Sequence, residues 1–259
     1  MGGRATQFGI EEQLLPNVME QIQTLEHVQV EGFHFHSISN HLDAVAHLNL
    51  IEYYFSLAGQ WAKEYGLQLG YLNAGGGIGV NYSDLEAQFE WHVFREGLAS
   101  LLRNMSVQAP TLVLECGRYV TASSGYYAAE VLDIKRNHGT NYVVVRGGTH
   151  HFRLPASWHH SHPFEVITLD DWHYEYERPT LEQSSIHIVG QLCTPKDVLA
   201  QQIHIDKVCV GDIVLFQYTG AYGWAISHHD FLSHPHPLHL FLDNKDQIQS
   251  LEEKQCQCR

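Results

Sequence analysis

Apolar residues recur at helical spacing in three stretches of the first half of the chain, residues 14–25, 41–65 and 84–102. Positions three and four apart share one face of a helix, so each stretch predicts a helix with one buried side. Either Ser39 or Asn40 is placed to cap the second helix with its side-chain oxygen.

Short apolar runs alternate with these helices and predict three strands, at residues 28–35, 69–72 and 111–115. The alternation of strand and helix is typical of an α/β fold with parallel strands. Polar residues gather at the carboxyl end of each predicted strand, where barrel and open α/β enzymes keep their sites.

The pattern changes near Gly125. Polar, histidine-rich or glycine-containing turns then separate five stretches that predict strands: 126–135, 141–145, 164–168, 184–189 and 213–218. We therefore expect a second, mostly antiparallel β domain. The polar tail, residues 243–259, is expected to be loose, and its Cys256 and Cys258 to lie in a frayed terminus rather than bind a soft metal.

Composition narrows the classes of function. Of the 259 residues, 44% are hydrophobic, which supports a sizeable core, and the net charge of −14 argues against a nucleic-acid partner. No apolar run approaches the roughly 20 residues of a membrane span and no signal peptide is recognised, so we expect no membrane partner. The 5 scattered cysteines do not suggest a disulfide framework, and they fit the reducing cytoplasm.

Histidine is unusually frequent, with 20 in the chain, and it clusters at residues 150–151, 159–162, 228–229 and 234–239. None of these clusters has the helical i, i+4 pair or the Cys/His spacing of zinc sites. We therefore predict no metal and expect solvated loops or the rim of an active site. A histidine-rich metal-binding protein is an alternative.

Four glycines in five positions, Gly75 to Gly77 and Gly79, follow the second predicted strand. Glycines leave backbone N–H groups accessible, and such a loop at the start of a helix is a common phosphate site. A tight strand-to-helix turn without a ligand is the alternative. A nicotinamide-binding loop is excluded, because the third glycine and the acidic residue of that motif do not follow at the required distances.

The other two strand ends carry acid–base groups. His34 and His36 lie on the same side of their strand, and an imidazole can stack on a flat cofactor or move protons. A structural histidine is the alternative. Glu115 ends an apolar strand and needs a partner. That partner is either Arg118, in a structural ion pair, or a protonated heterocycle nitrogen, with Arg118 then serving a phosphate.

Two loops of the expected β domain add candidates. Cys193 could donate a proton or act as a nucleophile if its pKa is tuned, and an inert buried thiol is the alternative. Tyr222 lies between Gly220 and Gly223, which suits a bent loop that presents the phenol, or a turn around a packed tyrosine.

Together these residues resemble the fold-type III pyridoxal 5′-phosphate (PLP) decarboxylases, the family of ornithine, arginine and diaminopimelate decarboxylases. The resemblance covers nearly the whole chain. It rests on five motifs in the family's order: His34-x-His36-x-x-Ser39, Gly75-Gly76-Gly77, Glu115-x-Gly117-Arg118, Gly190-x-Leu192-Cys193-x-x-x-Asp197 and Gly220-Ala221-Tyr222-Gly223. Segments 33–40 and 227–237 look closest to the branch found in siderophore biosynthesis.

The resemblance implies a fold: the C-terminal part of a PLP-binding (β/α)8 barrel, about three strands, in residues 1–122. Residues 123–259 would then form a C-terminal β domain that contributes to the active site of a homodimer. The resemblance also implies a phosphate-binding set: Ser39, Gly75, Gly76, Gly77, Gly117, Arg118 and Tyr222.

The resemblance implies roles for four more side chains. His36 would stack on the pyridine ring, and Glu115 would keep the ring nitrogen protonated, which makes the ring an electron sink. Cys193 would act from the partner subunit and protonate the carbanion after CO₂ leaves. Asp197 would help to bind the far end of the substrate.

The chain departs from the family pattern in several places. Ile38 replaces a common glycine, Cys116 a usual proline, and Thr194 stands where acidic residues are common, which puts a basic diamine-type substrate in doubt. The family also uses a Schiff-base lysine on an early barrel strand, and no lysine here has that context. A (β/α)8 barrel takes about 250 residues by itself, so we expect the chain to begin after the fifth strand and the lysine to lie in a missing N-terminal half.

The predicted function is therefore PLP-dependent decarboxylation of an amino acid or an amino-acid-derived substrate, possibly in siderophore biosynthesis, by a protein of which this chain alone is inactive. The alternative is a truncated or non-catalytic homologue that acts through partner binding. The absent lysine favours that alternative, whereas the retained Glu115, His36 and Cys193 favour the enzyme.

Overall fold

The computed structural model describes residues 5–105, 109–243 and 248–250. The chain divides into two compact units, Met1–Ser123 and Ser124–Arg259. Among the described helices, none combines the length and the apolar character needed to cross a membrane.

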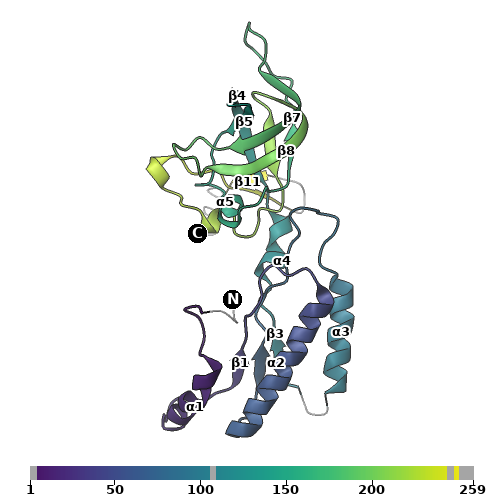
Figure 1. Cartoon of the computed structure of the whole chain (residues 1–259), viewed down its shortest axis with the longest axis vertical. Helices are drawn as coiled ribbons and strands as arrows, with labels where there is room; N and C mark the ends of the chain where they lie inside the picture. Colours follow the sequence, from purple (N-terminus) through teal and green to yellow (C-terminus); the bar gives the residue numbers. More distant parts are fainter. Residues whose placement is uncertain (1–4, 106–108, 244–247, 251–259) are drawn as a thin grey trace. The chain divides into compact units, whose positions relative to one another are not determined.

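The first unit is built on a three-stranded parallel sheet in the order β1-β2-β3 (Figure 1). Its strands are short: β1 (Gly32–His34), β2 (Tyr71–Asn73) and β3 (Thr111–Val113). Helix α2 (Ala44–Tyr65) connects β1 to β2, and helix α3 (Trp91–Asn104) connects β2 to β3. These are successive βαβ units, as the alternating pattern predicted.

Shorter helices flank the sheet of the first unit. They are η1 (Glu12–Leu14) and α1 (Leu15–Gln23) before β1, and α4 (Gly117–Thr121) and η2 (Ala122–Ser124) after β3. Because α4 begins four residues after β3 ends, it follows directly on the strand-end segment that carries Glu115.

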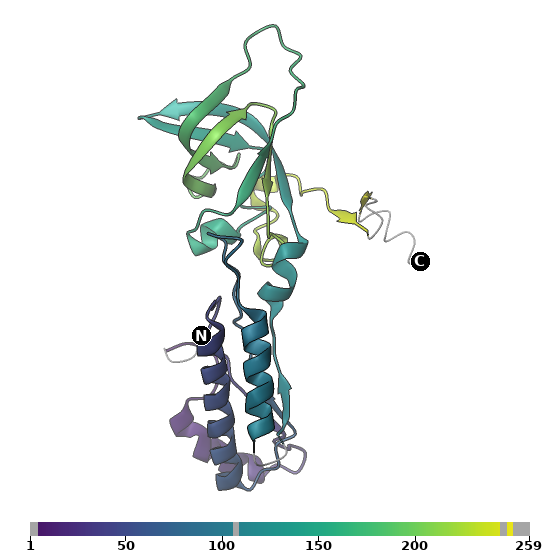
Figure 2. The same cartoon turned by 90° about the vertical axis from the view of Figure 1, so that its right-hand side faces the viewer.

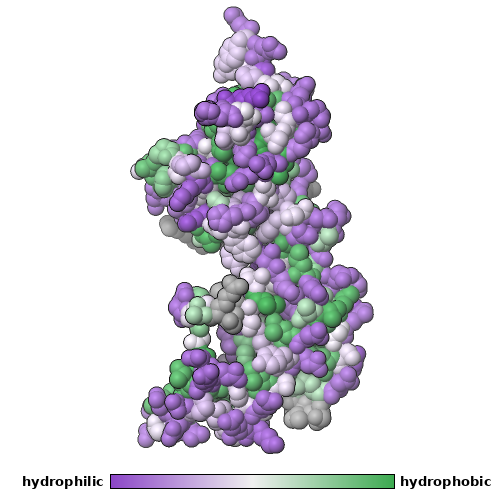
Figure 3. All heavy atoms as spheres, viewed as in Figure 1, coloured by the Kyte–Doolittle hydropathy of each residue, from purple (hydrophilic) through white to green (hydrophobic). Residues whose placement is uncertain are grey.

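Helices α2 and α3 cover one face of this sheet. The middle residue of each strand joins the hydrophobic core beneath them: Phe33, Leu72 and Leu112. The neighbouring residues point to the opposite face, as the two-residue period of a strand requires. There Tyr71 is 40% exposed and Val113 is 36% exposed. Figure 3 shows apolar side chains open to solvent on this unit.

Three details of the first unit correct the sequence analysis. Asp43, not Ser39 or Asn40, caps α2, because its Oδ1 accepts the N–H groups of Val45 and Ala46, both at 2.9 Å. Gly66 ends that helix in the left-handed conformation, directly after the predicted stretch 41–65. The first strand is shorter than the predicted stretch 28–35.

The expected start of the third helix, near residue 84, is also wrong. Helix α3 begins only at Trp91, so the glycine loop does not open directly into a helix. Asn81 explains the difference, because its Oδ1 accepts the N–H groups of Ser83 and Asp84, both at 3.1 Å. A side chain that takes these donors offers the backbone an alternative to helix.

The second unit is a six-stranded mixed sheet in the order β6-β9-β4-β5-β7-β8, and Figure 2 shows how strongly it twists. The strands are β4 (Tyr127–Asn137), β5 (Thr140–Val145), β6 (Phe164–Ile167), β7 (Thr180–Val189), β8 (Val198–Cys209) and β9 (Ile213–Phe216). Only β5 and β7 pair in parallel, so the predicted antiparallel character is confirmed.

Sequence analysis missed strand β8 and helix α5 (Leu154–Trp158). The register of the β7–β8 pair shifts beside Ile188, and Gln202 has a φ of 52°. Such irregularities break the alternation of apolar and polar residues by which a strand is recognised.

The tail is not wholly loose either. β10 (Leu240–Leu242) pairs antiparallel with β11 (Ile248–Ser250). Two 3-10 helices precede this hairpin, η3 (Trp224–Ile226) and η4 (Phe231–Ser233). Cys256 and Cys258 lie outside the described residues.

Candidate active site

Polar side chains of the first unit meet at the carboxyl ends of its three strands. Asn73 Nδ2 donates a 2.8 Å hydrogen bond to Glu115 Oε1, and His34 Nε2 lies 3.8 Å from Glu115 Oε2. His34 and Asn73 are register partners on β1 and β2, so the strand pairing itself brings them together. The carboxylate remains 53% exposed on the sheet face that the helices leave uncovered.

Glu115 therefore has neutral or weakly basic neighbours instead of a fixed cation. In the part of the chain that the structure describes, it forms no ion pair with Arg118, so that alternative is wrong. Arg118 is only 6% exposed, and its Nη1 donates a 3.0 Å hydrogen bond to the Tyr82 hydroxyl. The sequence analysis missed Tyr82, which lies three residues beyond Gly79 and has no motif of its own.

The glycine loop is packed against both neighbouring strand ends. A Cβ on Gly75 would lie 2.5 Å from the Phe35 oxygen, and a Cβ on Gly76 would collide with the Glu115 oxygen. Gly77 has a φ of 95°, which disfavours other residues. Close packing and backbone conformation thus explain these glycines without a ligand, and their role in phosphate binding remains a prediction.

Gly117 differs from the loop glycines. A Cβ there would meet no other atom within 4 Å, and its backbone does not have a positive φ. Nothing in the packing of the first unit requires a glycine at position 117, so the open space beside Gly117 can accommodate a ligand. Arg118 follows Gly117 in the chain, and the role of both residues in phosphate binding remains a prediction.

His36 presents a neutral ring. Its Nδ1 accepts the N–H of Gly76 at 3.3 Å, so the ring proton resides on Nε2. Burial lowers the pKa of His36 below its usual value and favours the neutral form. Ser39 is exposed in the segment between β1 and α2.

A role for Asn73 was also missed, although it lies two residues before Gly75. Besides binding Glu115, its Oδ1 accepts the N–H of Gly75 at 2.8 Å. One amide therefore ties the glycine loop to the carboxylate. A polar residue between a buried strand residue and a glycine run was the available signal.

Only one lysine, Lys63, occurs in the described part of the first unit. It lies in the last turn of α2, about 28 Å along the helix axis from Ala44. The helix start is the end that adjoins the carboxyl ends of the strands. Lys63 is therefore remote from Glu115 and cannot act in this cluster.

The second unit holds the remaining candidates. Cys193 is exposed and free in the loop between β7 and β8. Asp197, at the end of that loop, is 2% exposed and accepts the N–H groups of Thr149 at 2.6 Å and Leu192 at 2.9 Å. These contacts fix the loop, and the substrate-binding role of Asp197 remains a prediction. Tyr222 is 45% exposed at a φ of 55°, a bent conformation that presents its side chain.

The described histidine clusters form no metal centre. Within the described ranges, no group of three His, Cys, Asp or Glu side chains has an arrangement that could hold a metal ion. Instead, rings pack on one another: His150 lies 3.9 Å from His151 and 5.3 Å from His234, between ring centres.

Comparison with known proteins defines the family. A sequence profile described as "Pyridoxal-dependent decarboxylase, C-terminal sheet domain" matches residues 53–220. The chain therefore belongs to the pyridoxal-dependent decarboxylase family, and the resemblance and the fold class inferred from the sequence are both confirmed.

Two curated relatives are similar over most of this chain. The 2-[(L-alanin-3-ylcarbamoyl)methyl]-2-hydroxybutanedioate decarboxylase of Staphylococcus aureus is 48% identical, with 93% of this chain and 60% of the relative covered. The L-glutamyl-[BtrI acyl-carrier protein] decarboxylase of Niallia circulans is 30% identical, with 94% and 58% covered. The chain thus spans about three fifths of the length of these relatives.

A solved structure of the same family has a similar fold. Diaminopimelate decarboxylase from Helicobacter pylori, complexed with L-lysine, matches with a TM-score of 0.76 and 26% identity, covering 94% of this chain and 56% of that chain.

The residues of the first unit fit the cofactor that gives the family its name. PLP has an anionic phosphate, a flat ring and a basic ring nitrogen. The strand ends offer open space at Gly117, the cation of Arg118, the neutral ring of His36 and the half-exposed carboxylate of Glu115. Each chemical part of the cofactor has a complementary group.

Proposed function

We propose that this chain provides the strand-end and β-domain residues of a PLP-dependent decarboxylase that acts on an amino-acid-derived substrate. The observation that carries the proposal is the cluster of Asn73, Glu115 and His34 at the carboxyl ends of three parallel strands, next to His36. Family membership supports it. Residues 1–122 would be part of the PLP-binding barrel, and residues 123–259 the β domain.

Bound PLP would supply an electron sink for the bond to the departing carboxylate. Glu115 would hold a proton at the ring nitrogen, and the hydrogen bond from Asn73 would keep its carboxylate oriented for that task. His36 would lie against the ring, and its neutral state avoids a competing positive charge. Arg118 would bind the phosphate together with Ser39, Gly75, Gly76, Gly77, Gly117 and Tyr222.

Cys193 would donate a proton to the carbanion that remains after CO₂ leaves. Its exposed, free thiol is consistent with proton transfer to a substrate. We also propose that the protein is a homodimer in which Cys193 serves the partner's site, and that Asp197 supports this loop or binds the far end of the substrate. The free state of Cys116, Cys193 and Cys209 is consistent with a cytoplasmic location.

The substrate is proposed to carry carboxylates beyond the one that is lost. The staphylococcal relative, 48% identical, acts on a compound named as a substituted hydroxybutanedioate. Thr194, next to Cys193, adds no negative charge that would favour a diamine. Siderophore biosynthesis is the pathway we propose on this basis.

The position of Lys63 bears on where the Schiff-base lysine would lie. With no lysine near Glu115 among the described residues of the first unit, the Schiff-base lysine would come from a segment outside these residues. The same observation favours a second candidate, a non-catalytic homologue that acts through partner binding.

A complementation assay distinguishes the two candidates. The chain is co-expressed with the segment of the staphylococcal relative that the match leaves out, and release of labelled CO₂ from the relative's substrate is measured. The enzyme proposal predicts release from the pair and not from the chain alone. A Cys193→Ser variant should strongly reduce product formation, whereas Cys209→Ser, at a buried cysteine of β8, should not. Absence of release from a stable co-purified pair would contradict the enzyme proposal.

A further inference from the structure

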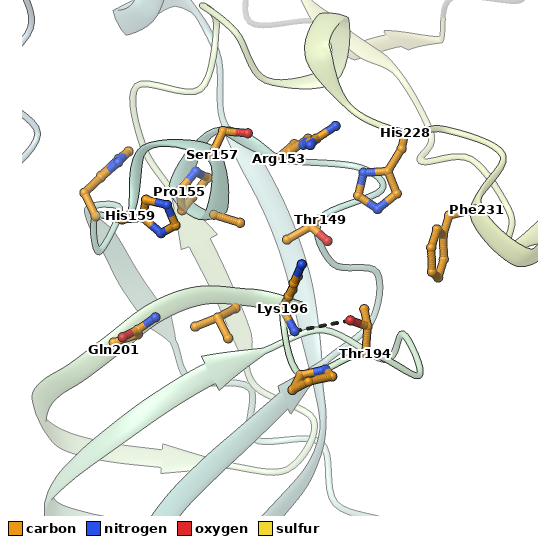
Figure 4. A pocket seen from close by; sticks show the side chains of 14 residues that line it. Thr149, Arg153, Pro155, Ser157, His159, Thr194, Lys196, Gln201, His228 and Phe231 are labelled. Carbon is orange, nitrogen blue, oxygen red and sulfur yellow. Dashed lines mark hydrogen bonds between the residues drawn. The ribbon is translucent and has the colours of Figure 1, made fainter.

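The second unit carries a group of aromatic rings in a loop that contains no residue of the proposed active site. The rings belong to Trp172, Tyr174 and Tyr176, which we call the aromatic tip, and the loop is the segment 168–179 between β6 and β7. Figure 2 shows this loop, drawn in green, extending beyond the strands that it connects. The cavity lined by residues 194–196, by contrast, lies beside the cysteine loop and is part of the active site proposed above (Figure 4).

The three rings of the aromatic tip pack on one another and still face solvent. The ring centre of Trp172 lies 4.8 Å from that of Tyr174 and 5.3 Å from that of Tyr176. Trp172 Nε1 also donates a 2.8 Å hydrogen bond to the Tyr176 oxygen. Yet Tyr174 is 62% exposed and Tyr176 is 59% exposed. Aromatic groups gathered in an exposed patch with a polar rim are typical of interaction sites.

Arg178 closes the base of the loop. Its Nη1 donates to the Leu169 oxygen and its Nε to the Val210 oxygen, both at 2.7 Å. Its Nη2 pairs with the buried carboxylate of Asp212, also at 2.7 Å. Because these contacts hold the ends of the loop together, the aromatic tip would lose little conformational freedom on binding a partner.

Negative charge surrounds the aromatic tip. Four exposed carboxylates lie among the rings along the chain: Asp170, Asp171, Glu175 and Glu177. Among the described residues, their one ion-pair partner is His173, which contacts Asp171. Residues 168–177 include no lysine or arginine. Exposed π-faces beside carboxylates favour a cationic partner, and a guanidinium group can stack on a ring while it pairs with a carboxylate.

One guanidinium group already lies on the aromatic tip. Arg178 Cζ is 5.9 Å from the centre of the Trp172 ring, which leaves the two exposed tyrosines for a partner. The rings of Tyr174 and Tyr176 are 5.3 Å apart, so they contact each other and leave no gap between them for a small organic cation. The aromatic tip is therefore suited to the surface of another protein, where Tyr, Trp and Arg side chains contribute most to binding.

We propose that the aromatic tip is a docking surface for a protein partner that presents arginine side chains. The guanidinium groups of the partner stack on Tyr174 and Tyr176, and the neighbouring carboxylates accept their N–H groups. The net charge of −14 disfavours a second copy of this chain as the occupant. The inference does not rest on the proposed function.

A labelled peptide of alternating arginine and glycine residues is the probe. Fluorescence anisotropy with the purified chain should show saturable binding, and the corresponding lysine peptide should bind more weakly, because an ammonium group does not stack as a guanidinium group does. Tyr174→Ala should weaken binding of the arginine peptide roughly two- to fivefold, the effect of one exposed cation–π contact. Tyr174→Phe keeps the π-face and should bind like the unmodified chain. Tyr53→Ala, at a 55% exposed tyrosine of α2, is the matched control and should change nothing.

Four results would overturn the inference. They are no saturable binding of the arginine peptide, unchanged affinity in Tyr174→Ala, an equal loss in Tyr53→Ala, and equal affinity for the lysine peptide. Sedimentation velocity tests the other occupant, because self-association that Tyr174→Ala abolishes would identify a second copy of this chain and overturn the arginine-bearing partner. Since peptide binding needs neither PLP nor turnover, failure of the proposed decarboxylation would leave its outcome distinct.

Discussion

Asn73 and Glu115 are joined by a hydrogen bond of 2.8 Å between the ends of β2 and β3. The same Asn73 side chain accepts the Gly75 N–H, so it connects the carboxylate to the glycine loop. An amide can make both contacts at once because its oxygen accepts while its nitrogen donates.

Replacement of Asn73 by Ala should therefore affect both stability and binding. We expect the free energy of unfolding to fall by about 1–3 kcal/mol, because the part-buried N–H of Gly75 loses its acceptor, Asn73 Oδ1. Affinity for PLP should fall as well. Urea unfolding and a PLP titration measure the two effects. Asn17→Ala, at an exposed position of α1, is the matched control and should change neither. An unchanged affinity in a folded Asn73→Ala protein would contradict the role given to this amide.

Gly76 and Gly117 should respond differently to the same added methyl group. In Gly76→Ala the Cβ collides with the Glu115 backbone oxygen, and we expect a loss of stability of about 1–3 kcal/mol or more. In Gly117→Ala the Cβ enters open space, and stability should be unchanged or higher by up to about 1 kcal/mol, the gain of Ala over Gly in a helix.

The Gly117→Ala protein then tests the site. Its unfolding midpoint should be equal to or higher than that of the unmodified chain, and it should bind PLP more weakly, because the methyl group occupies space that we assign to the ligand. Thermal unfolding and PLP titration on one sample provide both values. Full affinity in Gly117→Ala would remove Gly117 from the proposed phosphate site.

The sequence predicted which polar residues lie at the strand ends, because strands alternate regularly with helices and each motif directly follows a predicted strand. It placed His36, Glu115 and the glycines at the carboxyl ends of parallel strands, and this arrangement is confirmed. It did not predict that Glu115 contacts Asn73 rather than Arg118, because that depends on where two side chains turn after their strands end. Strand β8 escaped notice because a register shift hides its alternation.

Asp197 should be a structural support of the cysteine loop. In Asp197→Ala the N–H groups of Thr149 and Leu192 lose their acceptor, so we expect a loss of about 2–4 kcal/mol in the free energy of unfolding. Hydrogen exchange at these two amides should accelerate. Asp206→Ala, at an exposed carboxylate of β8, should have little effect. Unchanged exchange at Leu192 in Asp197→Ala would contradict this account.

Two buried histidines should make the protein sensitive to acid. Burial lowers the pKa of His47 and of His150 to about 4, from 6.5. Below pH 6.5 the unfolded chain binds protons that the folded chain refuses, so stability is complete above pH 6.5 and falls as the pH drops towards 4. Each histidine should contribute a loss of roughly 2–4 kcal/mol over this range.

Variants separate the two contributions. His47→Phe in the first unit and His150→Leu in the second should each reduce the difference in unfolding free energy between pH 7 and pH 4.5. Carboxylates also titrate there, so the comparison is with the unmodified chain under identical conditions. If neither variant changes the difference in unfolding free energy between pH 7 and pH 4.5, these two rings do not control the acid response.

The most direct test of the central claim is a PLP titration of the purified chain, followed by borohydride reduction and mass measurement. Absorbance and tryptophan fluorescence report binding. The account predicts saturable, reversible binding that Glu115→Gln alters in absorbance, and no added mass after reduction, because Lys63 is remote from Glu115. No saturable binding would contradict the claim that these strand ends hold the cofactor. A covalent adduct on a lysine of this chain would contradict the claim that the Schiff-base residue lies outside it.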